Sequence, residues 1–249
     1  MAKITKKLKL LKFIFFPFSL FIFISQPYCA EIQSLNLSSQ KQVMNYPKFF
    51  DQIQSIILKD PLGEFIGTSK NGIIEITYLD TVKMAGHSCS VVGGAYICAL
   101  KGLKALYGDK IPIRGEIIVE IKNPPTQDNA GVVGSVLSNI TGATTDFGFG
   151  GLPTGDFNRR NLLFYNAKID TDIRFTRIDT KQQIGINYHP QKIVNPKTIL
   201  MTAIGPDATQ ENKKTFPERF QKMVEYLFNQ SDKVVEIINY EHSNLPSKN

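Results

Sequence analysis

The alternation of apolar and polar side chains along the chain predicts several short helices and strands. An Asn71-Gly72 pair lies between two β-rich runs and predicts a hairpin, after which residues 73–79 form a strand. Upstream, the segment YPKFFDQIQSIILK predicts a helix that ends at Asp60-Pro61. Its apolar residues recur at helical spacing: Phe49, Phe50, Ile53, Ile56 and Ile57.

The middle of the chain contains the two strongest helix predictions. Residues 90–108, SVVGGAYICALKGLKALYG, are apolar on nearly every side and predict a mostly buried helix that ends near Gly108. A strand is predicted in RGEIIVEIK, which alternates in character, and a turn-rich connection follows it. Residues 129–140 then predict a second helix, whose small residues favour close packing on a sheet or on the first helix.

The second half of the chain predicts mostly strands. NLLFYNAKI, DIRFTRID and QQIGINYHP resemble successive strands of an antiparallel meander, and FPERFQKMVEYLFNQ predicts an amphipathic helix. The whole pattern predicts an α+β fold, with helices packed on a largely antiparallel sheet. We expect one domain over residues 47–230 and a polar C-terminal tail at 231–249.

The start of the chain predicts export. Five lysines precede the apolar run FIFFPFSLFIFI, and a small-residue site near Ala30 follows it. The run is shorter than the roughly 20 residues that span a bilayer, so residues 1–30 indicate a signal peptide, with an uncleaved anchor as the alternative. Residues 31–46 indicate a flexible lead-in. The mature protein is therefore expected to be periplasmic or secreted, without a membrane attachment.

Removal of residues 1–30 lowers the net charge of the protein. The formal charge of the chain is +7, and five lysines with no acidic residue leave with residues 1–30, so about +2 remains. A net charge this small gives no support to nucleic-acid binding, which needs a clustered basic surface. The remaining cysteines, Cys89 and Cys98, lie nine residues apart across a predicted helix, which is too long a span for a disulfide. Both are expected to be free thiols.

The segment MAGHSCSVVGGAY carries the main chemical signal. In an extended segment His87 and Cys89 point to the same side, so an imidazole and a thiolate can converge on one transition metal. Two ligands do not complete a zinc site. A buried histidine beside an apolar cysteine is the structural alternative, and a cysteine nucleophile with His189 as base and Asn187 as orienting group is a third interpretation.

A second candidate is the glycine-rich stretch after the second helix. The glycines at 150–155 have the spacing of a phosphate loop, but Asp156-Phe157 stand where that loop needs Lys and Ser/Thr. Nucleotide binding is therefore not expected. A segment this long and irregular is more typical of a functional loop.

GHSCSVVGGAYICALKGLKALYG, followed by a strand and by DNAGVVGSVLSNITGATTDFGFGGL, resembles the FmdE family of formylmethanofuran dehydrogenase components over residues 72–180. The resemblance implies an FmdE-like α+β core, a homodimer and a transition metal bound by His87 and Cys89. The sequence departs from the family pattern at Ser90, at Ala143 and in the region 131–135, where a proline and further thiol or carboxylate residues are usual. Remaining ligands would then come from Asp146 and His189.

These observations predict an exported, FmdE-like metal-binding protein, with zinc or nickel as the expected cofactor. The sequence does not decide whether it is an enzyme and indicates no particular reaction. The alternative is a non-catalytic module that binds a small molecule or a partner and has a degenerate metal site. In either case we expect the glycine-rich loop to contact the ligand, through Gly142, Thr144, Gly148, Gly150 and Gly151.

Overall fold

The computed structural model describes residues 44–240 of the 249-residue chain. The predicted signal peptide at 1–30, nearly all of the predicted lead-in at 31–46 and the end of the chain at 241–249 lie outside these residues. Among the helices formed by residues 44–240, none combines the length and the hydrophobicity that a membrane-spanning helix needs.

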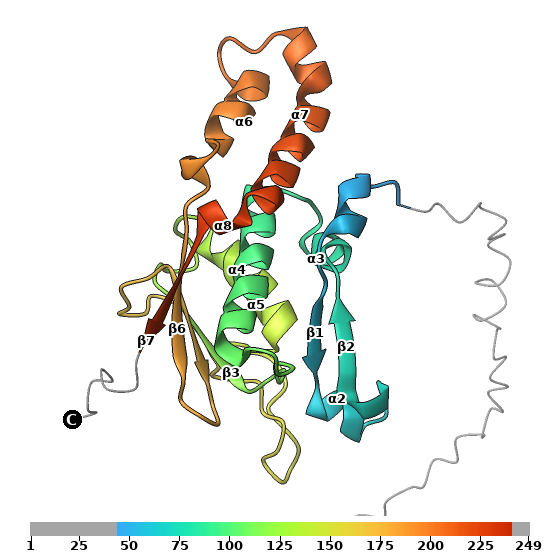
Figure 1. The fold of residues 1–249 in the computed structure, drawn as a ribbon, viewed down its shortest axis with the longest axis vertical. Coiled ribbons are helices and arrows are strands. Elements are labelled where there is room, and N and C mark those ends of the chain that lie inside the picture. Colours follow the sequence, from blue (N-terminus) through green and yellow to red (C-terminus); the bar gives the residue numbers. More distant parts are fainter. Residues whose placement is uncertain (1–43, 241–249) are drawn as a thin grey trace, which may run out of the picture. The chain divides into compact units, whose positions relative to one another are not determined.

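Two sheets form the β part of the fold. One is a two-stranded antiparallel sheet, and the other has five strands in the order β4-β3-β5-β6-β7, antiparallel except for the β3–β4 pair (Figure 1). This arrangement confirms the predicted α+β class with a largely antiparallel sheet. The strands are β1 Ile56–Lys59, β2 Ile73–Ile76, β3 Ile117–Ile121, β4 Leu163–Phe164, β5 Ile173–Arg177, β6 Gln183–Tyr188 and β7 Val235–Tyr240.

Helix α4 lies at the centre of the fold and packs on α3, α5, α7 and on strands β5, β6 and β7. The shorter helix α6 packs beside part of α7 (Figure 1). The α-helices are α2 Pro61–Phe65, α3 Tyr78–Ala85, α4 Ser90–Tyr107, α5 Ala130–Thr141, α6 Pro196–Ile204, α7 Gln210–Asn229 and α8 Ser231–Val234. Short 3-10 helices are η1 Lys48–Gln52, η2 Lys70–Gly72 and η3 Pro190–Lys192.

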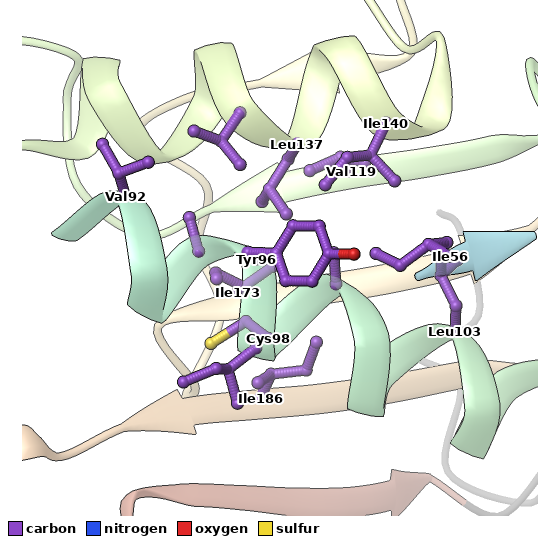
Figure 2. Packing of buried hydrophobic residues seen from close by; sticks show 14 of the residues in the cluster. Ile56, Val92, Tyr96, Cys98, Leu103, Val119, Leu137, Ile140, Ile173 and Ile186 are labelled. Carbon is purple, nitrogen blue, oxygen red and sulfur yellow. The ribbon is translucent and has the colours of Figure 1, made fainter. Parts of the chain in front are cut away.

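The core lies on both sides of α4. Tyr96 lies between α4 and α5 (Figure 2). Its single O–H is shared between the carbonyl oxygens of Gln54 and Ile76, which lie 2.9 and 3.0 Å from the hydroxyl oxygen. Cys98 points from α4 toward the sheet, beside Ile186, and is buried (Figure 2). Gly102 allows the close approach of α4 to the sheet, because a Cβ at this position would lie 2.5 Å from the Ile186 side chain.

Two predicted elements differ from the structure in the first half of the chain. The predicted helix before Asp60 is instead η1 followed by β1, because Ile56 and Leu58 are buried while Ile57 between them is exposed. The predicted strand at 73–79 ends at Ile76. Thr77 and Asp80 form a capping box there, which starts α3.

Two further corrections concern the sheet. β4 is not the first strand of a meander, since it pairs in parallel with β3. The polar tail predicted from residue 231 was also wrong in its boundary. Residues 231–240 form α8 and β7, and β7 pairs with the whole length of β6, from Tyr188↔Val235 to Gln183↔Tyr240. The domain therefore extends to Tyr240.

Candidate ligand and metal site at the amino-terminal end of α4

The His87–Cys89 segment connects α3 to α4. Gly86 ends α3 in the left-handed conformation, with a φ of 78°, and Cys89 is the N-cap residue of α4. The Cys89 sulfur accepts a hydrogen bond from the Val92 N–H at 3.4 Å. Cys89 is half-buried, whereas His87 is exposed and its Nδ1 lies 3.0 Å from the Ala85 carbonyl oxygen. The thiol therefore lies at the N-terminus of α4.

Side chains from three other elements hold the residues on either side of Cys89. The Tyr78 hydroxyl lies 2.8 Å from Ser88 Oγ, and Gln221 Nε2 donates to the Ser88 carbonyl oxygen at 3.1 Å. The Tyr188 hydroxyl donates to the Ser90 carbonyl oxygen at 2.9 Å. These side chains come from α3, α7 and β6, so the position of the thiol depends on the tertiary structure and not on the local sequence alone.

The tyrosines in this cluster are neutral at physiological pH. Burial raises the pKa of Tyr78 and of Tyr188 well above the usual value of a phenol. Burial likewise raises the pKa of the Cys98 thiol, which lies further along α4. Cys98 therefore behaves as a small apolar side chain, and Cys89 is the accessible thiol of the two.

The other predicted metal ligands lie apart from this segment. Asp146 is in the loop after α5, and His189 Nε2 lies 3.8 Å from a Glu236 carboxylate oxygen on β7. No group of three or more His, Cys, Asp or Glu residues within 44–240 has the arrangement to hold a metal ion. The structure thus places His87 and Cys89 in one segment but does not bring Asp146 or His189 to them.

The residues of the alternative cysteine-nucleophile site are not brought together either. Asn187 Oδ1 accepts a hydrogen bond from the Asp172 N–H at 3.0 Å, and its Nδ2 donates to Glu236 at 3.1 Å. His189 lies beside the same glutamate. Both residues are therefore directed toward β7, and no hydrogen bond within the described range joins either of them to Cys89.

The glycine-rich loop lies at the opposite end of α4. Arg159 Nη2 donates to Asp60 Oδ1 at 2.6 Å, and Arg114 Nη1 donates to Asp60 Oδ2 at 2.9 Å. Thr144 Oγ1 donates to the Arg159 carbonyl oxygen at 2.7 Å, so these ion pairs also fix the loop. Figure 1 shows the loop at the end of the domain away from α6 and α7.

This placement separates the predicted loop residues from Cys89. Gly142 packs against Arg114 and Arg159, and Gly148 accepts a hydrogen bond from Arg160 Nε at 2.8 Å through its carbonyl oxygen. Gly150 lies beside the Arg160 guanidinium, and Gly151 lies close to the Asp156 carbonyl. An 18-residue helix is about 27 Å long, so this loop does not cover the thiol at the far end of α4.

A cavity of about 290 Å³ lies beside the amino-terminal half of α4. Its floor is apolar and is formed largely by small side chains of α4 and α5 and by the ends of β3 and β5. Its rim is polar and comes from the connections that follow β3 and precede β5, together with Tyr188. The floor residues are Gly94, Ala95, Cys98, Ile121, Ala130, Val133 and Ile173, and the rim residues are Lys122, Asn123, Asp128, Asp172 and Tyr188.

The Tyr188 ring joins this cavity to the Cys89 segment. It packs directly on α4 at Gly94, where a Cβ would collide with the ring carbons. The side chain whose hydroxyl bonds to Ser90 therefore also lines the cavity. A ligand in the cavity would contact a side chain that also positions the start of α4.

Sequence reasoning missed the rim residues. Lys122 and Asn123 follow a predicted strand, and Asp128 lies in a predicted turn, so each had an ordinary explanation as a surface residue. One signal was present in the small residues of the two central helices, which were interpreted only as packing surfaces. No protein-family model and no curated protein sequence matches this chain.

Proposed function

We propose that this chain is a small-ligand-binding module whose ligand occupies the cavity between α4, α5 and the end of the five-stranded sheet. The observation that carries the proposal is a hollow with an apolar floor and a rim of charged groups that, within residues 44–240, form no ion pairs with one another. Its volume of about 290 Å³ is just below the range for small-molecule sites, roughly 300–1,000 Å³, and therefore suits a very small ligand.

The sequence of the two helices explains why the hollow exists. Ala95 of α4 and Ala130 of α5 place methyl groups where most core positions carry larger side chains, whereas the space beside Gly94 is filled by the Tyr188 ring. Protein interiors are otherwise packed at close to crystal density, and a hollow lined by small residues reduces stability. The two alanines, one in each helix, therefore leave space in the cavity that a small ligand would fill.

The test compares two substitutions on adjacent residues of α5. Val133→Phe places a ring in the cavity, whereas Val132→Phe adds the same ring to a half-buried position that does not line it. A panel of small metabolites is screened by thermal shift against the full chain. We expect at least one compound to raise the melting temperature of the unmodified protein and of Val132→Phe but not of Val133→Phe. A panel that stabilises all three proteins equally would contradict the proposal.

Metal binding by His87 and Cys89 is the second candidate function. It is supported by the fixed position of Cys89 at the N-terminus of α4 and by the exposed His87 ring two residues before it. With two ligands from one chain, the other positions of a zinc or nickel ion would be taken by water or by a second copy. Such a site binds more weakly than a four-thiolate site, and its affinity decreases as the pH falls because protons compete for both ligands.

Cysteine variants test this second candidate. Cys89→Ser should remove zinc or nickel uptake by demetallated protein, while Cys98→Ser should retain it and lower the melting temperature, since Cys98 is buried in the core. Circular dichroism checks that both variants stay folded. Demetallated protein that takes up neither metal would contradict the metal proposal and leave the cavity proposal intact.

We also propose that the protein belongs to the FmdE family, is exported and forms a homodimer. The resemblance over residues 72–180 supports the family membership and the homodimer. Export predicts a mature protein that lacks about 30 residues at its start, which intact-mass measurement on material from the native host can check. Light scattering at micromolar concentration checks the dimer, and a monomer would contradict it.

A further inference from the structure

We propose that the cavity binds a compact zwitterion, an α-amino acid with a short aliphatic side chain. This inference rests on the proposed function above and specifies the chemical class of its ligand. The ammonium group would lie at Asp172 and Asp128, the carboxylate at Lys122, and the aliphatic side chain on the apolar floor.

The first argument comes from Lys122 and Asp172, which lie opposite each other where β3 and β5 end. The antiparallel register pairs Ile121 with Ile173, and the Lys122 N–H then donates to the Asp172 carbonyl oxygen at 3.0 Å. Side chains at such opposite positions have their Cβ atoms roughly 5 Å apart and ordinarily interact. Yet within residues 44–240 no carboxylate oxygen lies within 4.0 Å of the Lys122 ammonium. Both charges therefore remain available to a ligand.

The second argument is that both carboxylates are held through one oxygen and leave the other available. Asp172 Oδ2 accepts the Tyr188 N–H at 2.9 Å. Asp128 Oδ2 accepts hydrogen bonds from Asn123 Nδ2 at 3.0 Å and from Gln127 Nε2 at 3.1 Å. In the described part of the chain no protein donor reaches Oδ1 of either residue. Two oriented acceptors at the rim suit the several N–H donors of an ammonium group.

The third argument excludes simpler ligands by charge. A free phosphate would meet two carboxylates, and the first N–H groups of α5 already donate to backbone oxygens, as at Gly131 to Pro125 and Val132 to Asn129. A bare divalent cation would meet the Lys122 ammonium. A ligand with both charges has a favourable partner for each, which is the arrangement that electrostatic complementarity favours.

The floor sets the size and polarity of the rest of the ligand. Ala95, Ala130 and Val133 present methyl groups, and the neutral thiol of Cys98 adds a further apolar surface because burial raises its pKa. The floor side chains are aliphatic apart from this thiol, so a hydroxyl or amide on the ligand side chain would lose its water without compensation. A short aliphatic side chain meets this surface without such a cost.

The experiment measures the affinity of the full chain for three related probes by isothermal titration calorimetry. Valine carries both charges, valinamide lacks the carboxylate, and 3-methylbutanoate lacks the ammonium; alanine and leucine vary the side chain. We expect valine to bind, and each analogue that lacks one charge to bind at least about tenfold more weakly, because a hydrogen bond to a charged group is lost.

Three variants assign the charges and separate this inference from the proposed function. Asp172→Asn keeps an acceptor for the Tyr188 N–H but should weaken valine binding at least about tenfold, and Lys122→Met should do the same. Lys110→Met, an exposed lysine outside the cavity, should leave it unchanged. Val133→Phe should abolish it.

The outcomes are distinguishable. Equal binding of valine and its two analogues, or no binding of any amino acid, would overturn the zwitterion assignment. The module itself would stand if other metabolites still bound in a way that Val133→Phe blocks. Valine binding that survives Val133→Phe would place the ligand elsewhere and contradict the proposed function as well.

Discussion

The two ends of α4 both depend on side chains from distant elements, but they use different chemistry. At the carboxyl-terminal end, a buried carboxylate, Asp60, pairs with Arg114 and Arg159, and these ion pairs fix the glycine-rich loop. At the amino-terminal end, neutral hydrogen bonds from Tyr78, Tyr188 and Gln221 fix the residues on either side of Cys89. Within the described residues, only this second end combines an accessible thiol with a cavity that has unpaired charges at its rim.

This difference shows how an irregular segment can be structural at one end of a helix and available for binding at the other. A smaller cavity of about 200 Å³ lies beside Arg159, but Glu116 and Asp156 line it together with the two arginines. Asp60 pairs with both guanidinium groups, although Arg159 Nη1 is buried without a hydrogen-bond partner. Glu116 and Asp156 form no ion pair within residues 44–240, so the contrast with the other end lies in the buried Asp60 ion pairs. At the amino-terminal end, Lys122 and Asp172 face each other without an ion pair, which leaves binding capacity unused by the fold.

The largest expected effect of a substitution is at the buried ion pair. The Asp60 and Arg159 side chains are only 10 and 6% exposed, so removal of the cation leaves a buried carboxylate with one partner instead of two. Arg159→Met should lower the free energy of unfolding by about 3–5 kcal/mol in urea titration. Arg160→Met removes an exposed guanidinium from the same loop and should cost less than about 1 kcal/mol. Equal losses in the two variants would show that the ion pair does not fix this end.

The same ion pairs predict acid sensitivity. Burial alone would raise the pKa of Asp60, but the hydrogen bond from Arg114, a backbone N–H and the charge of Arg159 together lower it below the usual value. A carboxyl whose pKa is lowered by folding stabilises the protein above its unfolded pKa, about 4, and this contribution is lost as pH falls through the folded pKa. We therefore expect unfolding free energy to decrease below about pH 4. Asp60→Asn, which is less stable at pH 7, should show a shallower dependence in the same urea titrations.

A smaller loss is expected from a methyl group at the amino-terminal end. Gly94→Ala would place its Cβ 2.8 Å from the Tyr188 hydroxyl oxygen and closer still to the ring carbons, so the ring must move away from α4. Overpacking of this kind costs about 1–3 kcal/mol. Gly93→Ala is the matched control, because its nearest contact would be 3.3 Å, to Phe228, and its effect should stay within about 1 kcal/mol. A stabilising Gly94→Ala would mean that the Tyr188 ring is not packed on α4.

The sequence predicted the central elements well because their signals are local. The apolar run that ends at Gly108 and the small-residue run before Gly142 each fill one helix, and the structure has α4 and α5 there. Elements whose pattern is short were less predictable. Phe49 and Phe50 precede a strand but coincide with helical spacing. In the edge strand β7 the adjacent Ile237 and Ile238 interrupt the alternation of apolar and polar residues.

The candidate site was predictable only in part. His87 and Cys89 could be identified because they lie within three residues of each other. The cavity could not, since Ala95, Lys122, Asp128 and Asp172 come together only when β3, β5 and the two central helices are assembled. Sequence spacing also cannot show whether a lysine and an aspartate at the ends of neighbouring strands form an ion pair. Such unpaired charges can be identified only in the tertiary structure.

The smallest effect that still distinguishes the two ends comes from one hydroxyl. Tyr188→Phe keeps the ring on Gly94 and removes the hydrogen bond to the Ser90 carbonyl oxygen, which should cost about 0.5–1.5 kcal/mol in urea titration. Because that bond holds the residue after Cys89, the same variant should also change the rate at which Cys89 reacts with a thiol reagent. Tyr226→Phe, which removes an exposed hydroxyl from α7, should change neither quantity. If Tyr188→Phe altered stability but not thiol reactivity, the hydroxyl would contribute to packing alone, and the positioning of Cys89 would depend on Tyr78 and Gln221.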